Sequence, residues 1–312
     1  MRTATLVLPE CARFAGEALP PGIAKRLGRA DRLTGQGGVE PLFDILPRGW
    51  PAAAATRQAE RGDAVGAAWV RADPAYVQPD INGARLLGIG RMLVLDSEST
   101  DALLQTLRPL FGDMGMPIEA TTPSRWYLRL AAGTPLPMFT DPGDALGADF
   151  FEHLPEGPVG RRWRALLSEA QVALHHHPLN ESRAAQGLPP VNSVWFWGGG
   201  QLPDHVSALV DRIYSDDEVV AAFARLARID HLTPPAAWPR AEDRVAIDLR
   251  DQRRLDRLCT DWIEPALADI AGRRLDVLSL QFHDGARFDV TRSQVVRFWK
   301  RPLHFLAPAT DA

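Results

Sequence analysis

The sequence predicts an α/β fold, in which a mostly parallel β-sheet is sandwiched by helices and a smaller α+β domain is inserted. From Arg161 onward, strand-like and helix-like segments alternate, which is typical of a parallel sheet covered on both faces. Residues 64–132 instead form a short run of strands around one helix. A connector rich in Pro and Gly, residues 133–158, lies between these regions and indicates a domain boundary.

The predicted domain limits follow from the sheet that the first strand is expected to join. ATLVLP, residues 4–9, is short and apolar, as expected for a buried strand, and we expect it to join the same sheet as the later strands. The α/β core is therefore predicted to contain residues 1–63 and 151–312, and the inserted α+β domain residues 64–150.

Within the predicted insertion, GAAWV (66–70) and ARLLGIG (84–90) have the composition of strands. Ser99 can cap a helix that buries one leucine-rich face. RWYLRL (125–130) alternates apolar and polar side chains, which predicts a half-buried strand.

The predicted core contains three further strands and three amphipathic helices. Asp216 or Asp217 can cap the second helix, and Asp284-Gly285 predicts a hairpin turn after the last strand. The strands are VNSVWFW (191–197), RVAIDL (244–249) and LDVLSLQF (275–282), and the apolar faces of the helices run from Trp163 to Leu174, Val219 to Ala227 and Leu255 to Ile270.

Composition excludes several classes of function. The formal net charge of −4 gives no overall basic field, so neither nucleic acid nor an anionic membrane is an expected partner. No apolar run approaches the roughly 20 residues of a membrane span, and Pro9 and Glu10 interrupt the N-terminal apolar stretch too early for a secretory signal. We therefore expect a cytoplasmic protein. Cys11 and Cys259 are too few and too far apart for a disulfide scaffold or a zinc site, and are expected to be buried thiols.

Sequence-local motifs for metal or phosphate chemistry are absent. His175, His176 and His177 are consecutive, so on a helix they point in directions about 100° apart and cannot converge on one ion. No phosphate-binding loop and no nucleophile elbow occurs. We expect no metal, no cofactor and no catalytic residue that these motifs would reveal.

The segment HPLNESRAAQGLPPVNSVWFWGGG, residues 177–200, is the best candidate for a site. Asn180, Arg183 and Asn192 supply amide and guanidinium donors suited to an anion. The three glycines after the strand permit a sharp turn and a close approach to a ligand. The structural alternative is that Asn180 caps a short helix, Arg183 pairs with a surface acid, and Trp195 and Trp197 pack in the core.

This segment resembles the H-P-x-N-x-x-R, G-x-x-P-A-N and G-x-G pattern of archaeal-type, cofactor-independent phosphoglycerate mutases of the alkaline phosphatase superfamily. The likeness extends to RWYL and FTDPGDALGADFFEHLP, which resemble part of that family's inserted domain. It is closer still to a bacterial branch whose members are named phosphoglycerate mutase-like or regulatory proteins. The resemblance implies an alkaline-phosphatase-like fold.

The resemblance implies a binding site without the family's catalytic apparatus. Catalytic members use a serine nucleophile and two divalent metals, whereas here the first strand leads into ECARF with no Asp-Gly and no following serine within reach. A regulatory or ligand-sensing relative is therefore expected, with a possible site for a small phosphorylated or carboxylated metabolite and an unknown protein partner. The ligand-binding residues that the resemblance implies are His177, Asn180, Arg183, Asn192, Trp195, Trp197, Gly198, Gly199, Gly200 and Arg125.

Two alternatives stay open from the sequence. One is an active phosphoglycerate mutase or another phosphotransferase with a rearranged site. The other is a protein-interaction module without a small ligand, in which the nine tryptophans are partly interface.

Overall fold

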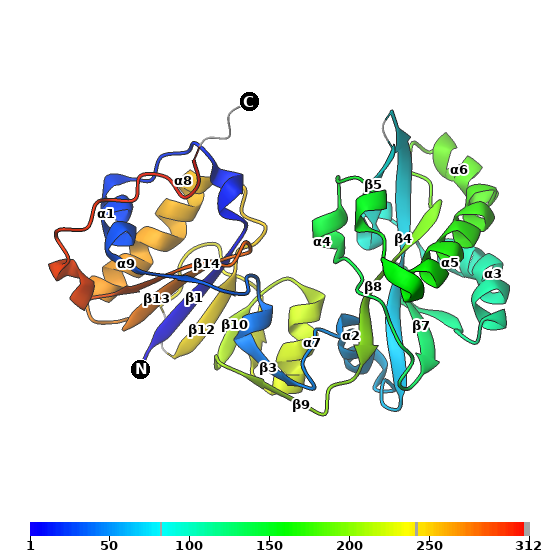
Figure 1. Ribbon diagram of the computed structural model, residues 1–312, viewed down its shortest axis with the longest axis horizontal. Helices are drawn as coiled ribbons and strands as arrows, with labels where there is room; N and C mark the ends of the chain where they lie inside the picture. Colours follow the sequence, from blue (N-terminus) through cyan, green and yellow to red (C-terminus); the bar gives the residue numbers. More distant parts are fainter. Residues whose placement is uncertain (82, 241–242, 309–312) are drawn as a thin grey trace. The chain divides into compact units, whose positions relative to one another are not determined.

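The computed structural model describes residues 1–81, 83–240 and 243–308, which form two compact units (Figure 1). Unit 1 comprises Met1–Ile45 and His205–Ala312, and unit 2 comprises Leu46–Asp204. The predicted insertion was residues 64–150, so the bounds differ. The helix before residue 64 and the whole stretch from 151 to 204 pack in unit 2 rather than with the parallel sheet.

Unit 1 is built on a seven-stranded sheet. Its strands, in order across the sheet, are β11 (Asp230–Leu232), β10 (Arg212–Tyr214), β12 (Arg244–Asp248), β1 (Thr3–Leu8), β13 (Val277–Phe282), β14 (Ala286–Thr291) and β2 (Asp31–Thr34). The strands from β11 to β13 are parallel, and β14 is antiparallel to both of its neighbours. The predicted α/β class with a mostly parallel sheet is confirmed.

Helices cover one face of this sheet with apolar side chains. They are α1 (Pro21–Arg29) and the run α8 (Leu255–Arg257), η5 (Leu258–Ile263) and α9 (Glu264–Ala271). Leu6, Leu8 and Leu280 pack with Leu27 and Trp262 in this core. The run is the long helix expected from residue 255 to 270, but η5 is a π-helical turn. Pro265 follows at the start of α9, where a residue without an amide hydrogen is tolerated.

The hairpin and the helix cap predicted in this half are confirmed. Gly285 has φ +85° in the turn between β13 and β14, a conformation that glycine adopts without steric cost. The carboxylate of Asp217 accepts from the amides of Val219 and Val220 and so caps α7 (Glu218–Ala227). The smaller elements of unit 1 are η1 (Cys11–Phe14), η2 (Glu40–Leu42), η6 (Ser293–Val296) and the strand pair β3 (Phe43–Leu46) and β9 (His205–Ala208).

Unit 2 is an antiparallel sheet with helices. The strands are β5 (Gly83–Ile89), β4 (Ala67–Asp80), β7 (Arg125–Ala131), β6 (Ile118–Thr122) and β8 (Ser193–Gln201), and the helices are α2 (Ala52–Arg61), α3 (Ser97–Asp113), α4 (Pro142–Ala145), α5 (Gly157–His175) and α6 (Leu179–Ala185), with short turns η3 (Gly90–Leu93) and η4 (Phe151–His153). The cap of α3 is Asp96, whose carboxylate accepts from the amide of Ser99, rather than Ser99 itself.

The strand that carries the two tryptophans was predicted to lie in the parallel sheet of the core, and this prediction is wrong. β8 pairs antiparallel with β4 in unit 2. The ring of Phe196 meets Phe111 of α3 and Trp163 of α5, whereas Trp195 and Trp197 point to the opposite face. Because both faces are covered, residues 194–197 of β8 are all apolar and buried, which is the pattern of a buried parallel strand. Among the described residues, no helix is long and apolar enough to cross a bilayer.

Candidate functional site

The predicted ligand-binding segment lies in unit 2, and Asn180 is used there as a clamp on the main chain. Its amide nitrogen donates to the carbonyls of Leu174, at 2.9 Å, and Val191, at 3.1 Å, and its amide oxygen accepts from the Val191 amide at 2.8 Å. The side chain therefore ties the end of α5 to the chain that enters β8, and it is not a helix cap.

Arg183 is buried and also bonds to main-chain carbonyls. Its Nε donates to Pro189 at 2.8 Å, and Nη2 donates to the carbonyl of Leu93. Burial lowers the pKa of this guanidinium, and Asp96 opposes that effect. The partners of the charge are backbone dipoles rather than the surface acid of the structural alternative.

Asn192 and His177 complete this arrangement. The side chain of Asn192 accepts from the Val77 amide and donates to the Val77 carbonyl, at 2.9 and 2.8 Å, so it extends the pairing of β8 with β4. His177 Nδ1 accepts from the Leu179 amide at 3.2 Å, while its Nε2 lies 3.3 Å from the carbonyl of Ala102. The polar residues of the motif thus have structural partners, and their role in ligand binding stays a prediction.

The three glycines lie inside β8, where helix α2 and the preceding proline approach closely. A Cβ on Gly198, whose φ is +63°, would lie 2.8 Å from the Cβ of Ala52, and one on Gly200 would lie 2.7 Å from Pro51. A Cβ on Gly199 would meet Leu136 and Phe139 at about 3 Å on the other face. These glycines make room for neighbouring elements and lie within β8 rather than in a turn after it, and their role in ligand binding stays a prediction.

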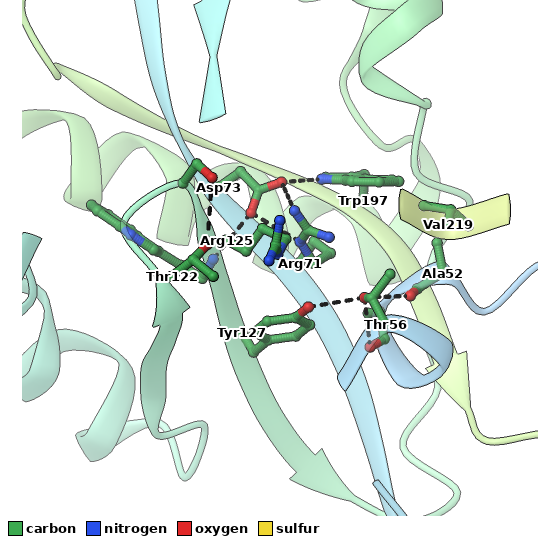
Figure 2. A network of polar contacts seen from close by, with 12 residues as sticks. Ala52, Thr56, Arg71, Asp73, Thr122, Arg125, Tyr127, Trp197 and Val219 are labelled. Atoms are coloured by element: carbon green, nitrogen blue, oxygen red, sulfur yellow. Dashed lines mark hydrogen bonds and ion pairs between the residues drawn. The ribbon is translucent and has the colours of Figure 1, made fainter. Parts of the chain in front are cut away.

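The remaining predicted residues adjoin a buried polar network (Figure 2). Arg71 and Asp73, both on β4, form a bidentate ion pair at 2.9 and 2.8 Å. The indole of Trp197 donates to the same carboxylate at 2.8 Å, and the amide of Trp126 donates to it at 3.1 Å. The Trp195 indole donates instead to the carbonyl of Thr140.

Arg125 lies beside this network and is partly exposed. Its guanidinium pairs with Glu60 of α2, which also accepts from the hydroxyl of Tyr127 at 3.0 Å. Tyr127 in turn donates to Thr56 at 2.9 Å, as Figure 2 shows. Arg125 is therefore the one candidate from the sequence whose charge lies in a cluster of ionic side chains, within the part of the chain that the structure describes.

A second ionic network lies at the carboxyl ends of β10 and β12 in unit 1, the edge of a parallel sheet where α/β proteins commonly bind ligands. Arg250 donates from Nε and Nη2 to Asp248, at 2.8 and 2.7 Å, and from Nη2 to Asp217 at 2.7 Å. Ser215 donates to Asp248 at 2.8 Å and accepts from the Asp217 amide at 3.0 Å. One guanidinium thus bridges two carboxylates.

The arginine and the aspartates of this network stabilise one another in their charged forms. Burial raises the pKa of the Asp248 carboxyl, but the hydrogen bonds and charge of Arg250, together with Ser215, hold that pKa below its usual range. Burial lowers the pKa of Arg250, and the two carboxylates outweigh it and raise that pKa above its ordinary value. Asp248 is therefore an anion and Arg250 a cation at neutral pH.

The residues at this edge do not fit the two divalent metals of the catalytic phosphoglycerate mutases that the sequence resembles. Both oxygens of Asp248 accept from Arg250, while Asp217 divides its oxygens between Arg250 and the cap of α7. Residues 1–81, 83–240 and 243–308 contain no group of three His, Cys, Asp or Glu side chains placed to hold a metal ion. A cationic guanidinium lies between carboxylates that a metal site would need as ligands.

Two side chains near the ends of parallel strands could act as nucleophiles, Cys11 after β1 and Ser215 after β10, but neither is activated. Cys11, just after β1, is buried, and burial with the nearby Asp284 carboxylate raises its pKa to about 12. Its thiol is thus protonated at neutral pH, in agreement with the inert thiol expected from the sequence. Ser215 is buried and hydrogen-bonded to Asp248, and its neighbour Asp217 donates its amide to the hydroxyl oxygen.

Sequence reasoning missed both networks, although each has a local signal. In WVRADP and IDLRD an arginine and an aspartate are two residues apart, so on a strand they share a face. The first pair lies within β4, whereas the second has its aspartate at the last position of β12 and its arginine just beyond. The sequence predicted Asp216 or Asp217 only as a helix cap, whereas Asp217 both caps α7 and pairs with Arg250.

Comparison with known proteins shows a resemblance over part of the chain. No protein-family model matches the chain. The chain is 39% identical over 62 residues to a probable 2,3-bisphosphoglycerate-independent phosphoglycerate mutase of Geobacter sulfurreducens, and 36% identical over 64 residues to such a mutase of Methanothrix thermoacetophila. The chain resembles cofactor-independent phosphoglycerate mutases. Each match covers 20% of this chain and only 16% of the relative, so it spans about a sixth of those proteins.

Two solved structures are also similar. They are a cofactor-independent phosphoglycerate mutase from Thermoplasma acidophilum, with a TM-score of 0.41, and the PH0037 protein from Pyrococcus horikoshii, with a TM-score of 0.43. Each is 15% identical and covers 93% of this chain, with 89% and 87% of the respective structures covered.

Proposed function

We propose that this phosphoglycerate mutase-like protein works without the metal-dependent mutase chemistry and has a regulatory or ligand-sensing role, responding to a small phosphorylated or carboxylated metabolite. The observation that carries the proposal is the Arg250 guanidinium, which bridges Asp217 and Asp248 at the carboxyl edge of the parallel sheet. A guanidinium neutralises the carboxylates, but it cannot accept an electron pair from a phosphoryl oxygen as a metal does.

Ser215, the serine at this edge, is also unsuited to accept a phosphoryl group. A phosphoserine mechanism needs a hydroxyl that is deprotonated by a metal or a base and open to the substrate. Ser215 is buried, and its hydroxyl hydrogen bonds to Asp248. Ligand binding can persist without catalysis, because an anion needs only positive charge and donors that are placed in advance.

The catalytic part is tested with the intact protein and 3-phosphoglycerate, with Mn²⁺ added and then with excess chelator. We expect no formation of 2-phosphoglycerate in either condition, and no change in melting temperature on chelation. A turnover that chelator abolishes would show an active mutase with a rearranged site and would overturn the proposal.

The sensing part is tested by thermal shift with 3-phosphoglycerate and inorganic phosphate. A saturable rise in melting temperature is expected, since a ligand that binds only the folded state stabilises it by mass action. Arg125→Gln should reduce this rise, because its guanidinium is partly exposed beside the Arg71 network. Arg129→Gln, an exposed change on the same strand, is the matched control. A flat response to both ligands would leave a protein-interaction module as the function.

The predicted cytoplasmic location belongs to this proposal. A sensor of phosphorylated metabolites must meet them where they are made. Fractionation of cells that produce the full chain tests it, with recovery outside the cytoplasmic compartment as the contrary result.

A further inference from the structure

A short segment after β14 differs in charge from the rest of the chain. Residues 292–301 contain four cations and no acidic residue, although the whole chain has a formal net charge of −4. The cations are Arg292, Arg297, Lys300 and Arg301. The segment is coloured orange to red in Figure 1. No membrane partner was predicted from the net charge of the whole chain. That net charge conceals this local excess of positive charge.

The same residues expose large apolar side chains. Phe298 and Trp299 are 78% and 66% exposed, and their rings meet edge to face with centroids 5.5 Å apart. Val295 and Val296 are also exposed. Exposing two such aromatic rings to solvent is unfavourable unless a partner covers them, because they carry the largest apolar areas of any side chains.

The backbone that presents these rings is fixed to unit 1. Arg29, at the end of α1, donates to the carbonyl of Val295 at 2.8 Å, and Arg297 donates back to the carbonyl of Arg29 at 3.0 Å. The buried amide of Gln294 donates to Asp31 and to the carbonyl of Asp289, each at 3.0 Å. The aromatic pair therefore projects from an anchored base, which reduces the backbone entropy lost on binding.

We propose that this basic aromatic segment, residues 292–301, docks the protein reversibly onto an anionic lipid surface. Aromatic rings with adjacent Lys and Arg are the combination that partitions into the headgroup region, where the rings leave water and the cations meet lipid phosphates. Arg292, Lys300 and Arg301 are exposed, whereas Arg297 pairs with Asp31 and helps to hold the base.

The size of the segment favours a lipid surface over a macromolecular partner. A stable protein interface takes about 20 to 30 residues on each side, and this projection has ten. Tight nucleic-acid binding rests on about six to ten phosphate contacts, which exceeds the cations present. A bilayer needs no complementary shape, and an apolar insertion joined to a basic cluster supplies the two signals that reversible docking requires.

The test is sedimentation of the full chain with vesicles of phosphatidylcholine alone or with 30% phosphatidylglycerol, roughly a typical anionic fraction. We expect at least about tenfold stronger binding to the anionic vesicles, weakening steeply between roughly 0.1 and 0.5 M salt. Phe298→Ala with Trp299→Ala should reduce binding about tenfold or more, as should Arg292→Gln with Lys300→Gln and Arg301→Gln.

Matched control variants distinguish docking by this segment from nonspecific binding to vesicles. Arg161→Gln, Arg228→Gln and Arg253→Gln together remove the same charge from exposed positions elsewhere, and Met138→Ala removes an exposed apolar side chain in unit 2. Both controls should bind as the wild type does. All nine altered positions, five in the segment and four in the controls, are exposed, so far-ultraviolet circular dichroism should be unchanged. Equal binding to both vesicles, no vesicle binding, or retention only by a single-stranded oligonucleotide or an acidic peptide at the same salt would each overturn the proposal.

Discussion

Two arginine–aspartate networks in this protein have the same chemistry and opposite electrostatics. In unit 2, Arg71 and Asp73 lie within a strand, and the Arg71 side chain is 2% exposed. In unit 1, Arg250 and Asp248 lie at a sheet edge, and the Arg250 side chain is 27% exposed. Burial raises the pKa of Asp73 despite its pairing with Arg71 and its bonds from Trp197 and Trp126, whereas the pKa of Asp248 is lowered.

The difference shows that pairing alone does not set the protonation of a carboxylate. Arg250 acts on Asp248 where water still reaches the guanidinium, so the loss of hydration is smaller than the gain from the ion pair. In unit 2 the loss of hydration of both charges is almost complete. The buried network therefore depends strongly on each of its members, and the edge network less so.

Breaking the buried pair should give the largest effect. Arg71→Met leaves the Asp73 carboxylate buried without its cation and also removes the contacts of the guanidinium over Tyr127 and Trp197. We expect the free energy of unfolding to fall by about 3–5 kcal/mol, measured by urea denaturation. Arg85→Met, which breaks the exposed pair with Asp80, is the control and should leave the urea midpoint unchanged. A loss at Arg71 no larger than that of the control would refute the comparison.

Breaking the edge network should have a smaller effect and should create a cation site. Arg250→Met removes three donated hydrogen bonds to Asp248 and Asp217, with an expected loss of about 2 kcal/mol. The two carboxylates then repel each other, so millimolar Mg²⁺ or Ca²⁺ should raise the melting temperature of the variant and leave that of the wild type unchanged. A variant that is indifferent to divalent cations would contradict this view of the edge.

Gly198, which follows Trp197 of the buried Arg71–Asp73 network, offers a finer test. Gly198→Ala would place a Cβ 2.8 Å from the Cβ of Ala52, which pushes α2 away from the buried network, and φ +63° adds strain. We expect a loss of about 1–3 kcal/mol. Gly187→Ala has φ +71° but open space around its Cβ, so the difference between the two variants measures packing alone. Equal losses would mean that backbone strain accounts for the whole effect.

The sequence predicted the parallel sheet and its helices because apolar periodicity is local, and the turn at Gly285 because an Asp-Gly pair restricts the turn type. It did not predict that β8 pairs with β4, since strand pairing depends on residues 115 or more positions apart, such as Asn192 and Val77.

The partners of the motif's side chains could not be predicted from the sequence, and its role in ligand binding stays a prediction. Nothing local distinguishes an Arg183 that binds carbonyls of Pro189 and Leu93 from one that binds an anion. The spacing of Arg71 and Asp73 placed them on one face, yet their burial follows from α2, which covers that face from an earlier part of the chain.

The pH dependence of stability is the most delicate test of the comparison, because the two aspartates should change it in opposite directions. The folded-state pKa of Asp248 lies below the unfolded value of about 3.9, so its contribution is present at neutral pH and is lost as the pH falls through the folded value. Asp248→Asn should therefore flatten the acid limb of a plot of unfolding free energy against pH. For Asp73 the folded pKa is the higher one, so the folded state binds more protons and stability falls as pH rises between the two values. Asp73→Asn should steepen the acid limb, whatever it does to stability at neutral pH. If both variants changed the slope of the acid limb in the same direction relative to the wild type, the opposition between the networks would be refuted.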